Sequence, residues 1–162
     1  MYMEIKLEHS MNIGKKHFDE LPEYDDTIPY DWNQIDNIVT DIADRIKRRQ
    51  VKFDNIIGLS RGGLIPGVML SHKLNVNFVP IVWQTRDGTI KDKVTLSKYN
   101  DGANLIVDDL IDSGETYFQI KKYAPMAKYC ALFNKQYTIM LDYWGTTLYN
   151  EHRWLDFPWE KQ

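Results

Sequence analysis

Among its 162 residues the sequence has a single cysteine, four histidines and no long run of apolar side chains. Cys130 has no partner for an internal disulfide bond, which favours a reducing compartment. The histidines are not spaced as metal ligands are. No apolar segment is long enough to cross a bilayer, and residues 1–9 lack the apolar stretch of a secretion signal. We therefore expect a cytoplasmic protein without an integral membrane segment.

Positive charge is not in excess either. Lysine and arginine total 20 against 23 aspartate and glutamate residues, for a formal net charge of −3, whereas nucleic-acid binding requires a basic surface. The basic run 47–49 is interpreted as the solvated end of a helix. Hydrophobic residues make up 43% and charged residues 27%, which is typical of a folded domain with a buried core. We expect no nucleic-acid partner.

Residues 1–30 differ in composition from the rest of the chain. The segment from Asp19 to Tyr30 is acidic and aromatic, and proline interrupts it twice. It predicts an extended N-terminal arm with at most one short element, and its aromatic part, 18–32, is suited to a subunit contact. The remainder, 31–162, is predicted to form one domain.

After the arm, the hydrophobic pattern predicts alternating helices and strands. Asp31 is a suitable N-cap, and apolar residues recur at spacings of three and four up to Ile46, which predicts an amphipathic helix. Short apolar runs without polar alternation predict strands buried on both faces, at 55–59, 78–83, 103–107 and 129–133. Further helices are predicted at 64–74 and 116–123. This order predicts an α/β fold, a parallel β-sheet flanked by helices, with ligands at the carboxyl ends of its strands.

The third predicted strand is followed by an acidic run and by a turn that opens a helix. The segment reads Asp108-Asp109-Leu110-Ile111-Asp112-Ser113-Gly114-Glu115-Thr116. The N–H groups of the helix start and two hydroxyls suit a phosphate group, and the glycine lets the chain approach it closely. Asp108 and Asp109 suit sugar hydroxyls or a divalent cation. A simple helix cap accounts for one polar residue of the turn but not for two carboxylates that end an apolar strand, because burying charge is costly.

The first predicted strand ends in a second turn, Ser60-Arg61-Gly62-Gly63. Its N–H groups and its guanidinium suit a polyanion such as pyrophosphate. By itself an Arg-Gly-Gly sequence is more often a plain turn, and the segment matches neither the Walker A loop nor the Rossmann fingerprint. The acidic run strengthens the interpretation of this turn as an anion site, because both segments follow strands of one predicted sheet.

Together the two segments resemble the type I phosphoribosyltransferase family. The acidic run and its turn are similar to that family's signature for phosphoribosyl pyrophosphate (PRPP), and Ser60 to Gly67 is similar to its pyrophosphate loop. Lys135 and the segment from Trp154 to Trp159 add a likeness to the bacterial xanthine–guanine branch of the family. The resemblance covers about residues 30–159. It implies a phosphoribosyltransferase-like sheet with a small hood formed by the terminal segments.

The resemblance also implies an activity. A purine phosphoribosyltransferase transfers ribose 5-phosphate from PRPP to a 6-oxopurine (xanthine, guanine or hypoxanthine) and releases pyrophosphate, in purine salvage. It implies Mg²⁺ as cofactor, PRPP and a purine base as small-molecule partners, and a homo-oligomer, either a dimer or a tetramer. Two alternatives stay open: a non-catalytic regulatory protein that binds PRPP or nucleotides with the same fold, and a phosphoribosyltransferase for another base. The acidic residues favour an enzyme.

The residues assigned to PRPP by resemblance belong to the two turns and the acidic pair: Asp108, Asp109, Ser113, Gly114, Glu115, Thr116, Ser60, Arg61 and Gly62. The turn before the helix would hold the 5-phosphate, and the acidic pair would accept from the ribose hydroxyls, with Asp109 also near Mg²⁺. The arginine turn would bind pyrophosphate and contain a cis peptide bond at Ser60–Arg61. Glu115 departs from what a phosphate loop favours, so its carboxylate is expected to point to solvent while its backbone binds.

The base is assigned to four other residues. Asp112 would be the catalytic residue that faces the base nitrogen as general base or charge stabiliser. Lys135 would donate to the purine 6-oxo group, which disfavours adenine because its 6-amino group also donates. Trp154 would stack on the ring, and the backbone of Leu155 would read the 2-substituent. Without the resemblance, a solvated lysine and a core tryptophan are the simpler interpretations.

A long polar stretch at 84–102 separates the second and third predicted strands. Structureless stretches of this length are uncommon inside a compact domain and often serve as lids. We interpret it as a loop that closes over the reacting centre, and an ordinary exposed hairpin is the alternative.

Overall fold

A five-stranded parallel sheet forms the centre of the computed structural model, which describes residues 26–83 and 91–160. The strands are β2 (Asn55–Leu59), β3 (Asn77–Ile81), β4 (Asn104–Ile111), β5 (Lys128–Asn134) and β6 (Tyr143–Thr147). Their order across the sheet is β3-β2-β4-β5-β6, and every neighbouring pair is parallel. This confirms the predicted α/β fold.

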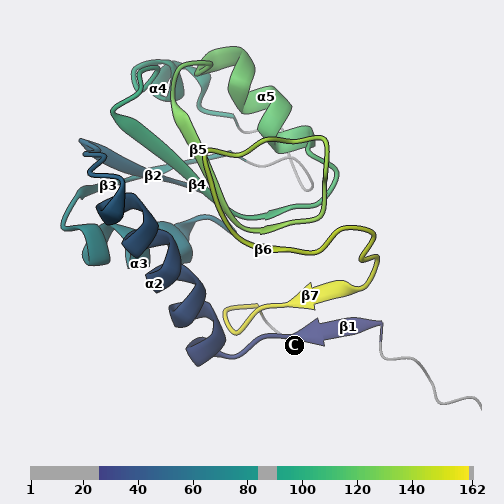
Figure 1. The fold of residues 1–162 in the computed structure, drawn as a ribbon. Helices are drawn as coiled ribbons and strands as arrows, with labels where there is room; N and C mark the ends of the chain where they lie inside the picture. The colour runs from purple at the N-terminus through teal and green to yellow at the C-terminus, as the bar shows by residue number, and fades with distance from the viewer. Residues whose placement is uncertain (1–25, 84–90, 161–162) are drawn as a thin grey trace, which may run out of the picture.

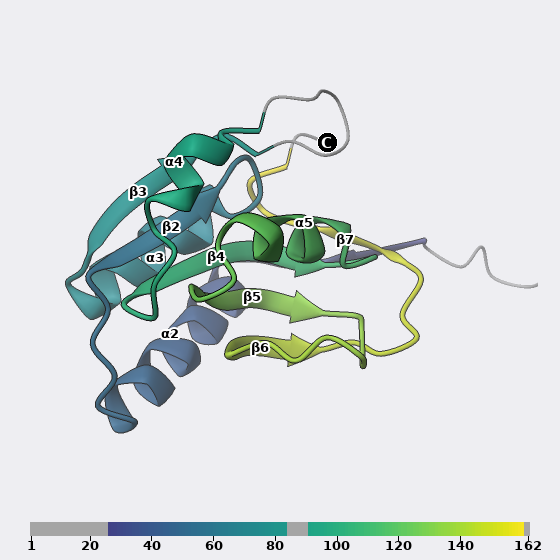
Figure 2. The same ribbon diagram turned by 90° about the horizontal axis from the view of Figure 1, so that it is seen from above.

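Helices cover both faces of the sheet (Figures 1 and 2). One face carries α2 (Trp32–Arg48) and α3 (Leu64–Leu74), and the other carries α4 (Lys93–Ser97) and α5 (Glu115–Tyr123). Alternate residues of β4 enter two separate cores, since Leu105 and Val107 pack with α2 and α3 while Ile106 packs on the opposite side. An apolar run without alternation is therefore what this central strand requires.

Helix α2 forms as its sequence predicts. Asp31 caps it, because its carboxylate accepts from the Gln34 backbone N–H at 2.8 Å while the Gln34 side chain accepts from the Asp31 N–H at 2.8 Å. Its buried face consists of the residues spaced by three and four: Ile35, Val39, Ile42, Ala43 and Ile46. The helix ends at Arg48, in the basic turn, as expected.

Strand β4 is longer than predicted. It continues four residues past Val107, so Asp108 and Asp109 lie inside the strand and do not follow it. The pairing with β2 stops at Val107, whereas the pairing with β5 continues to Ile111. The second half of β4 therefore has one edge free of strand pairing, on the side of the turn after β2, and this half carries the acidic pair. The predicted strand at 78–83 is also shifted, because β3 ends at Ile81.

The terminal segments form a second, two-stranded parallel sheet beside the main one (Figure 1). It pairs β1 (Thr27–Pro29) with β7 (Trp154–Asp156). Tyr30 and Phe157 attach this sheet to the domain, since each ring lies within 5.5 Å, centroid to centroid, of the buried Phe133 ring. The small hood implied by the resemblance is thus confirmed. Of the predicted arm, residues 1–25 lie outside the described residues, and 26–30 contain the single short strand β1.

The polar stretch after β3 is only partly described. Residues 84–90 of the predicted lid lie outside the described residues, but 91–102 contain α4. Leu96 of α4 is fully buried and belongs to the same core as Ile120 of α5. This part of the stretch is not structureless, because α4 packs on the core through Leu96. Lys91 forms an antiparallel bridge with Trp83, and the Asp92 N–H donates to the Val82 carbonyl oxygen at 3.0 Å, a pairing that the hairpin alternative requires.

Within residues 26–83 and 91–160, none of the helices combines the length and the apolar composition that a membrane span requires.

Candidate active site

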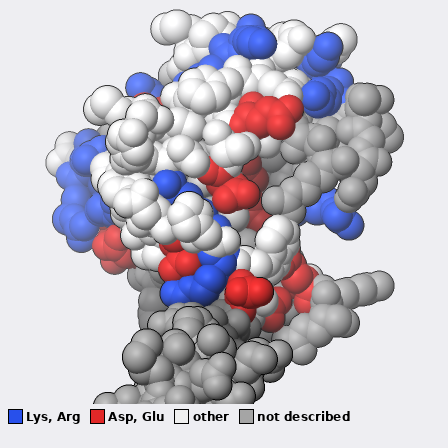
Figure 3. Space-filling model, turned by 90° about the vertical axis from the view of Figure 1, so that its right-hand side faces the viewer, with Lys and Arg blue, Asp and Glu red and all other residues white. Residues whose placement is uncertain are grey.

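A cavity of about 830 Å³ lies at the carboxyl end of the sheet. Three segments distant in the sequence line it: the end of β2 with its turn, the second half of β4 with the start of α5, and the tail from β7 onward. Figure 3 views this side of the molecule and shows acidic side chains gathered in the middle of the face. All thirteen site residues named from the sequence line this cavity: Ser60, Arg61, Gly62, Asp108, Asp109, Asp112, Ser113, Gly114, Glu115, Thr116, Lys135, Trp154 and Leu155.

The arginine turn is in direct contact with strand β4, at and just before the acidic pair. A Cβ added at Gly62 would lie 2.1 Å from Oδ2 of Asp109, and one added at Gly63 would lie 2.1 Å from the carbonyl oxygen of Val107. Real side-chain carbons do not approach other atoms so closely, so any larger residue would push the turn away from β4. Glycine at these two positions is what lets the arginine turn lie against the acidic strand.

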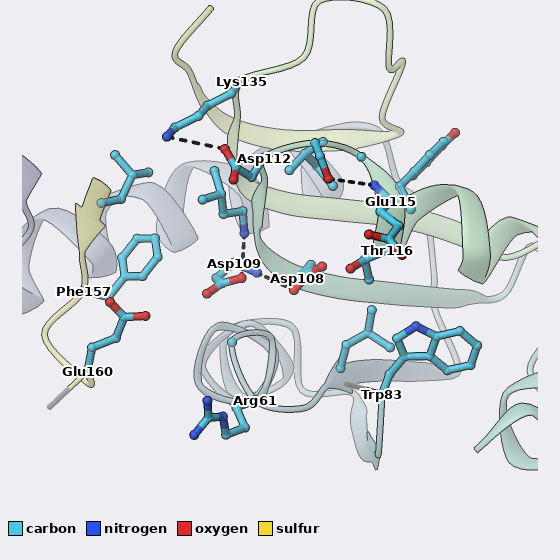
Figure 4. A pocket seen from close by; sticks show the side chains of 18 of the residues that line it. Arg61, Trp83, Asp108, Asp109, Asp112, Glu115, Thr116, Lys135, Phe157 and Glu160 are labelled. Carbon is cyan, nitrogen blue, oxygen red and sulfur yellow. Dashed lines mark hydrogen bonds and ion pairs between the residues drawn. The ribbon is translucent and has the colours of Figure 1, made fainter. Parts of the chain in front are cut away.

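The turn after β2 is also tied to the end of β3. The Ser60 N–H donates to the carbonyl oxygen of Ile81 at 2.9 Å, and the Ser60 hydroxyl accepts from the Trp83 N–H at 3.1 Å. The Ser60–Arg61 peptide bond is cis, as the resemblance implies. Arg61 is exposed and lines the cavity, below the acidic pair in Figure 4.

The turn before α5 has the geometry of an anion site. Gly114 is the N-cap with φ of 83°, a left-handed conformation that favours glycine, and a Cβ there would lie 2.3 Å from Ile139. The N–H groups at the start of α5 and the hydroxyls of Ser113 and Thr116 border the cavity. Glu115 is exposed, and its carboxylate accepts from the Gln119 side chain at 2.7 Å, one turn along the helix. The residue is thus exposed and paired along α5, but it also belongs to the lining of the cavity.

The acidic pair is buried and held in place by the protein. One oxygen of Asp108 accepts from the Tyr129 hydroxyl at 3.1 Å and the other from the Asp109 N–H at 3.1 Å. Burial, followed by the charge of Asp109, raises the pKa of Asp108 well above its usual value. Burial also raises the pKa of Asp109, whose carboxylate accepts from the Leu110 N–H at 2.8 Å. When ionised, these buried carboxylates are stabilised by hydrogen bonds from hydroxyl groups or by a nearby cation.

The charges around the cavity are strongly unequal. Of the residues that the structure describes, two cations line it, Arg61 and Lys135, against six carboxylates: Asp108, Asp109, Asp112, Glu115, Asp156 and Glu160. Among the described residues no group of three metal-ligating side chains is assembled. Oxygen donors in small number fit Mg²⁺, which keeps several waters and takes phosphate oxygens as ligands. These few oxygen donors do not fit a metal ion whose ligands all come from the protein.

The opposite end of the cavity combines a lysine with aromatic rings (Figure 4). Lys135 follows β5, and its ammonium donates to the carbonyl oxygen of Arg153 at 2.8 Å and lies 3.6 Å from a carboxylate oxygen of Asp112. Trp154 is about half exposed, and its indole N–H donates to Glu160 at 3.3 Å. Phe157 and Trp159 stack with ring centroids 4.8 Å apart. This end can therefore hold a flat polar ring between aromatic and charged groups.

Sequence reasoning missed several residues of the site. Trp83, Phe157, Trp159 and Glu160 line the cavity, and Tyr129 lies beneath it on Asp108. The end of the second predicted strand pointed to the region of Trp83, and the tail motif pointed to the region of Phe157. No sequence signal distinguished Tyr129 from an ordinary core residue.

Comparison with known proteins agrees with this geometry. Residues 30–143 match the family described as the phosphoribosyl transferase domain. The chain belongs to the phosphoribosyltransferase family. The matched range includes both turns, the acidic pair and Lys135 and ends before Trp154.

Individual phosphoribosyltransferases show the same likeness. The chain is 30% identical over 141 residues to a xanthine-guanine phosphoribosyltransferase of Idiomarina loihiensis, which covers 80% of this chain and 84% of that protein. It superposes on a purine phosphoribosyltransferase from Pyrococcus horikoshii with a TM-score of 0.64 and 29% identity, over 85% of this chain and 96% of the other. It shares the fold, at 18% identity and a TM-score of 0.62, with a Helicobacter pylori xanthine-guanine-hypoxanthine phosphoribosyltransferase, over 83% and 93% of the two chains.

Proposed function

We propose that this phosphoribosyltransferase transfers ribose 5-phosphate from PRPP to a ring nitrogen of a 6-oxopurine and releases pyrophosphate. One observation carries the proposal: a single cavity joins a phosphate turn, an acidic pair, an arginine turn and an end lined by a lysine and aromatic rings. The named relatives act on purines, which supports a purine as acceptor. A role in purine salvage in the cytoplasm follows from this assignment.

The reaction breaks the bond between the anomeric carbon and the pyrophosphate oxygen and forms a bond from that carbon to the base nitrogen. Positive charge develops on the sugar while the bond breaks, and negative charge develops on the leaving group. Groups already in place before the reaction stabilise such charges best, because they need no rearrangement. The site must therefore hold three parts of PRPP at once: the phosphate, the ribose and the pyrophosphate.

Each part of PRPP has a candidate partner. The N–H groups and hydroxyls of 113–116 bind the 5-phosphate, and Asp108 and Asp109 accept from the ribose hydroxyls. Ser60, Arg61 and Gly62 bind the pyrophosphate, and the Arg61 guanidinium offsets the charge that it gains on leaving. Asp109 would be the protein residue nearest to Mg²⁺, directly or through water. When bound, Mg²⁺ supplies charge neutralisation to the phosphates.

The base occupies the end that carries Lys135. Its ammonium, held by the Arg153 carbonyl, donates to the 6-oxo group, and Trp154 stacks on the ring while the Leu155 backbone reads the 2-substituent. Asp112 lies between this end and the phosphate turn and accepts the proton that the base nitrogen loses, or stabilises the charge of the transition state. The 3.6 Å separation of Asp112 and Lys135 supports the proposal that both groups act on one bound base.

Turnover with a panel of bases tests the function. The native chain is incubated with PRPP, Mg²⁺ and guanine, xanthine, hypoxanthine, adenine or uracil, and nucleotide formation is followed. We expect nucleotides from the 6-oxopurines and a decrease of about 100-fold or more in kcat for Asp112→Ala, as is typical for loss of a general base. Asp44→Ala, on the exposed face of α2, is the matched control and should keep full activity.

Other results would point elsewhere. Tight nucleotide binding without turnover of any base would indicate a regulatory protein, and turnover of uracil alone would indicate a different acceptor.

We also propose a homo-oligomer, a dimer or a tetramer, in which the aromatic segment 18–32 contributes to a subunit contact. Trp32, the described tryptophan of this segment, is 51% exposed. Sedimentation of the native chain tests this proposal.

A further inference from the structure

Trp83 presents a polar atom without a partner beside the cavity. The side chain is only 3% exposed, and its indole nitrogen is buried without a hydrogen-bond partner in the described part of the chain. Buried donors are almost always paired in folded proteins, and leaving one unpaired is energetically costly. A lone N–H at the wall of a ligand cavity therefore indicates that a ligand atom accepts from it.

The position of Trp83 is fixed from two sides. Its backbone N–H donates to the Ser60 hydroxyl, and its ring contacts Tyr123 of α5 edge-on, with ring centroids 5.9 Å apart. The residue thus lies between the arginine turn and α5. In Figure 4 the indole edge that carries the nitrogen faces Thr116, at the end of the cavity away from Lys135 and Phe157. This is the phosphate end.

Among the described residues, one cation lies close to the turn at 112–116: the Lys135 ammonium, 3.6 Å from the Asp112 carboxylate. The turn at 112–116 contains no cation and brings the carboxylates of Asp112 and Glu115. A phosphate dianion must therefore be bound mainly by neutral donors, the N–H groups and hydroxyls of this turn. Each further neutral donor matters in such a site, because a hydrogen bond to a charged acceptor is stronger than one between neutral groups.

We propose that the indole N–H of Trp83 donates to the phosphate ester bound by the turn at 112–116, which makes Trp83 a phosphate-recognition residue of the PRPP site. The inference rests on the proposed function, because it takes PRPP as the ligand. It adds a donor from the segment that follows β3 to a phosphate site otherwise built from the turn between β4 and α5. Binding relieves the cost of the unpaired N–H, so the free energy of that bond contributes to PRPP affinity.

The test compares two ligands that differ in the 5-phosphate. Titration calorimetry with Mg²⁺ measures the affinity of the native chain and of Trp83→Phe for PRPP and for inorganic pyrophosphate, which lacks the ester. Phenylalanine keeps an aromatic ring but has no N–H. We expect PRPP to bind about ten- to hundredfold more weakly to the variant, as for loss of a hydrogen bond to a charged group, and pyrophosphate to bind as before. Trp144→Phe, on β6 away from the cavity, is the matched control and should change neither affinity.

The remaining outcomes decide against the proposal in distinguishable ways. Unchanged PRPP affinity, or an equal loss for both ligands, overturns the role of Trp83 and leaves the proposed function intact. A native chain that binds neither ligand overturns both. If Trp83→Phe does not fold, the indole ¹⁵N–¹H signals of the native chain replace it, with the Trp83 signal assigned by elimination from single variants of the other four tryptophans. Addition of PRPP, but not of pyrophosphate, must then shift this signal downfield.

Discussion

Gly62 and Gly102 show how differently two glycines can be surrounded in one chain. A Cβ at Gly62 would meet the Asp109 carboxylate at 2.1 Å, whereas a Cβ at Gly102 would meet nothing within 4 Å. We expect Gly62→Ala to separate the arginine turn from the acidic strand and to lower kcat/KM for PRPP by at least about 100-fold, since misplaced groups lose most of their effect. Gly102→Ala should retain native kinetics. Similar activity of the two variants would show that the arginine turn need not touch the acidic strand.

The Tyr129 hydroxyl is one of two hydrogen-bond donors to the buried carboxylate of Asp108. Tyr129→Phe leaves one oxygen of Asp108 short of a donor and should lower the free energy of unfolding by about 1–3 kcal/mol. Urea unfolding measures the difference. The control Tyr137→Phe removes a hydroxyl from a ring that is 73% exposed and should change stability by less than about 0.5 kcal/mol. Equal stabilities of the native chain and Tyr129→Phe would contradict the burial argument.

At the scale of single elements, α2 depends on a local signal at its start. Asp31 and Gln34 form a reciprocal pair of hydrogen bonds, each 2.8 Å long, that satisfies two N–H groups at the end of the helix. Asp31→Ala should therefore lower the free energy of unfolding by about 1 kcal/mol, measured by urea denaturation. Asp44→Ala removes an equally exposed carboxylate from the middle of the helix and should not destabilise the protein. A loss of the same size at both positions would mean that surface charge, rather than capping, stabilises α2.

The elements also show where local reasoning succeeds and where it fails. The predicted helix at 64–74 coincides with α3 and the predicted strand at 55–59 with β2, because both follow from patterns within one segment. The predicted end of β4 at residue 107 was wrong, because two consecutive carboxylates ordinarily indicate the point where a buried strand ends. In the structure, pairing with β5 alone carries the strand to Ile111. The sequence of β4 alone cannot predict this extension, because it depends on how far the neighbouring strands β2 and β5 extend beside it.

At the scale of the whole molecule, the proposed function gives the cavity a phosphate end and a base end. Lys135→Gln should lower kcat/KM for the base about ten- to hundredfold, because a charged donor to the 6-oxo group is lost. It should leave PRPP affinity within about twofold, because the contact of Lys135 with the turn is to Asp112, which is assigned to the base and not to the phosphate. Initial rates at varied base and calorimetry with PRPP give the two numbers. Lys128→Gln, at the exposed start of the same strand, is the control and should change neither, whereas a parallel loss of PRPP affinity in Lys135→Gln would contradict two separate ends.

The sequence by itself determined the local features of this protein: the capped helix, the apolar strands, the glycine turns and the family resemblance carried by the acidic run. These depend on neighbouring residues, whose spacing is fixed by the covalent chain. Only the tertiary structure decided that Tyr129 donates to Asp108, that Trp83 lies on the side of Thr116 and that the tail lines one cavity with Lys135. Those contacts depend on strand register and on how helices pack against the sheet, and the free energy that selects them comes from burial across segments far apart in the chain.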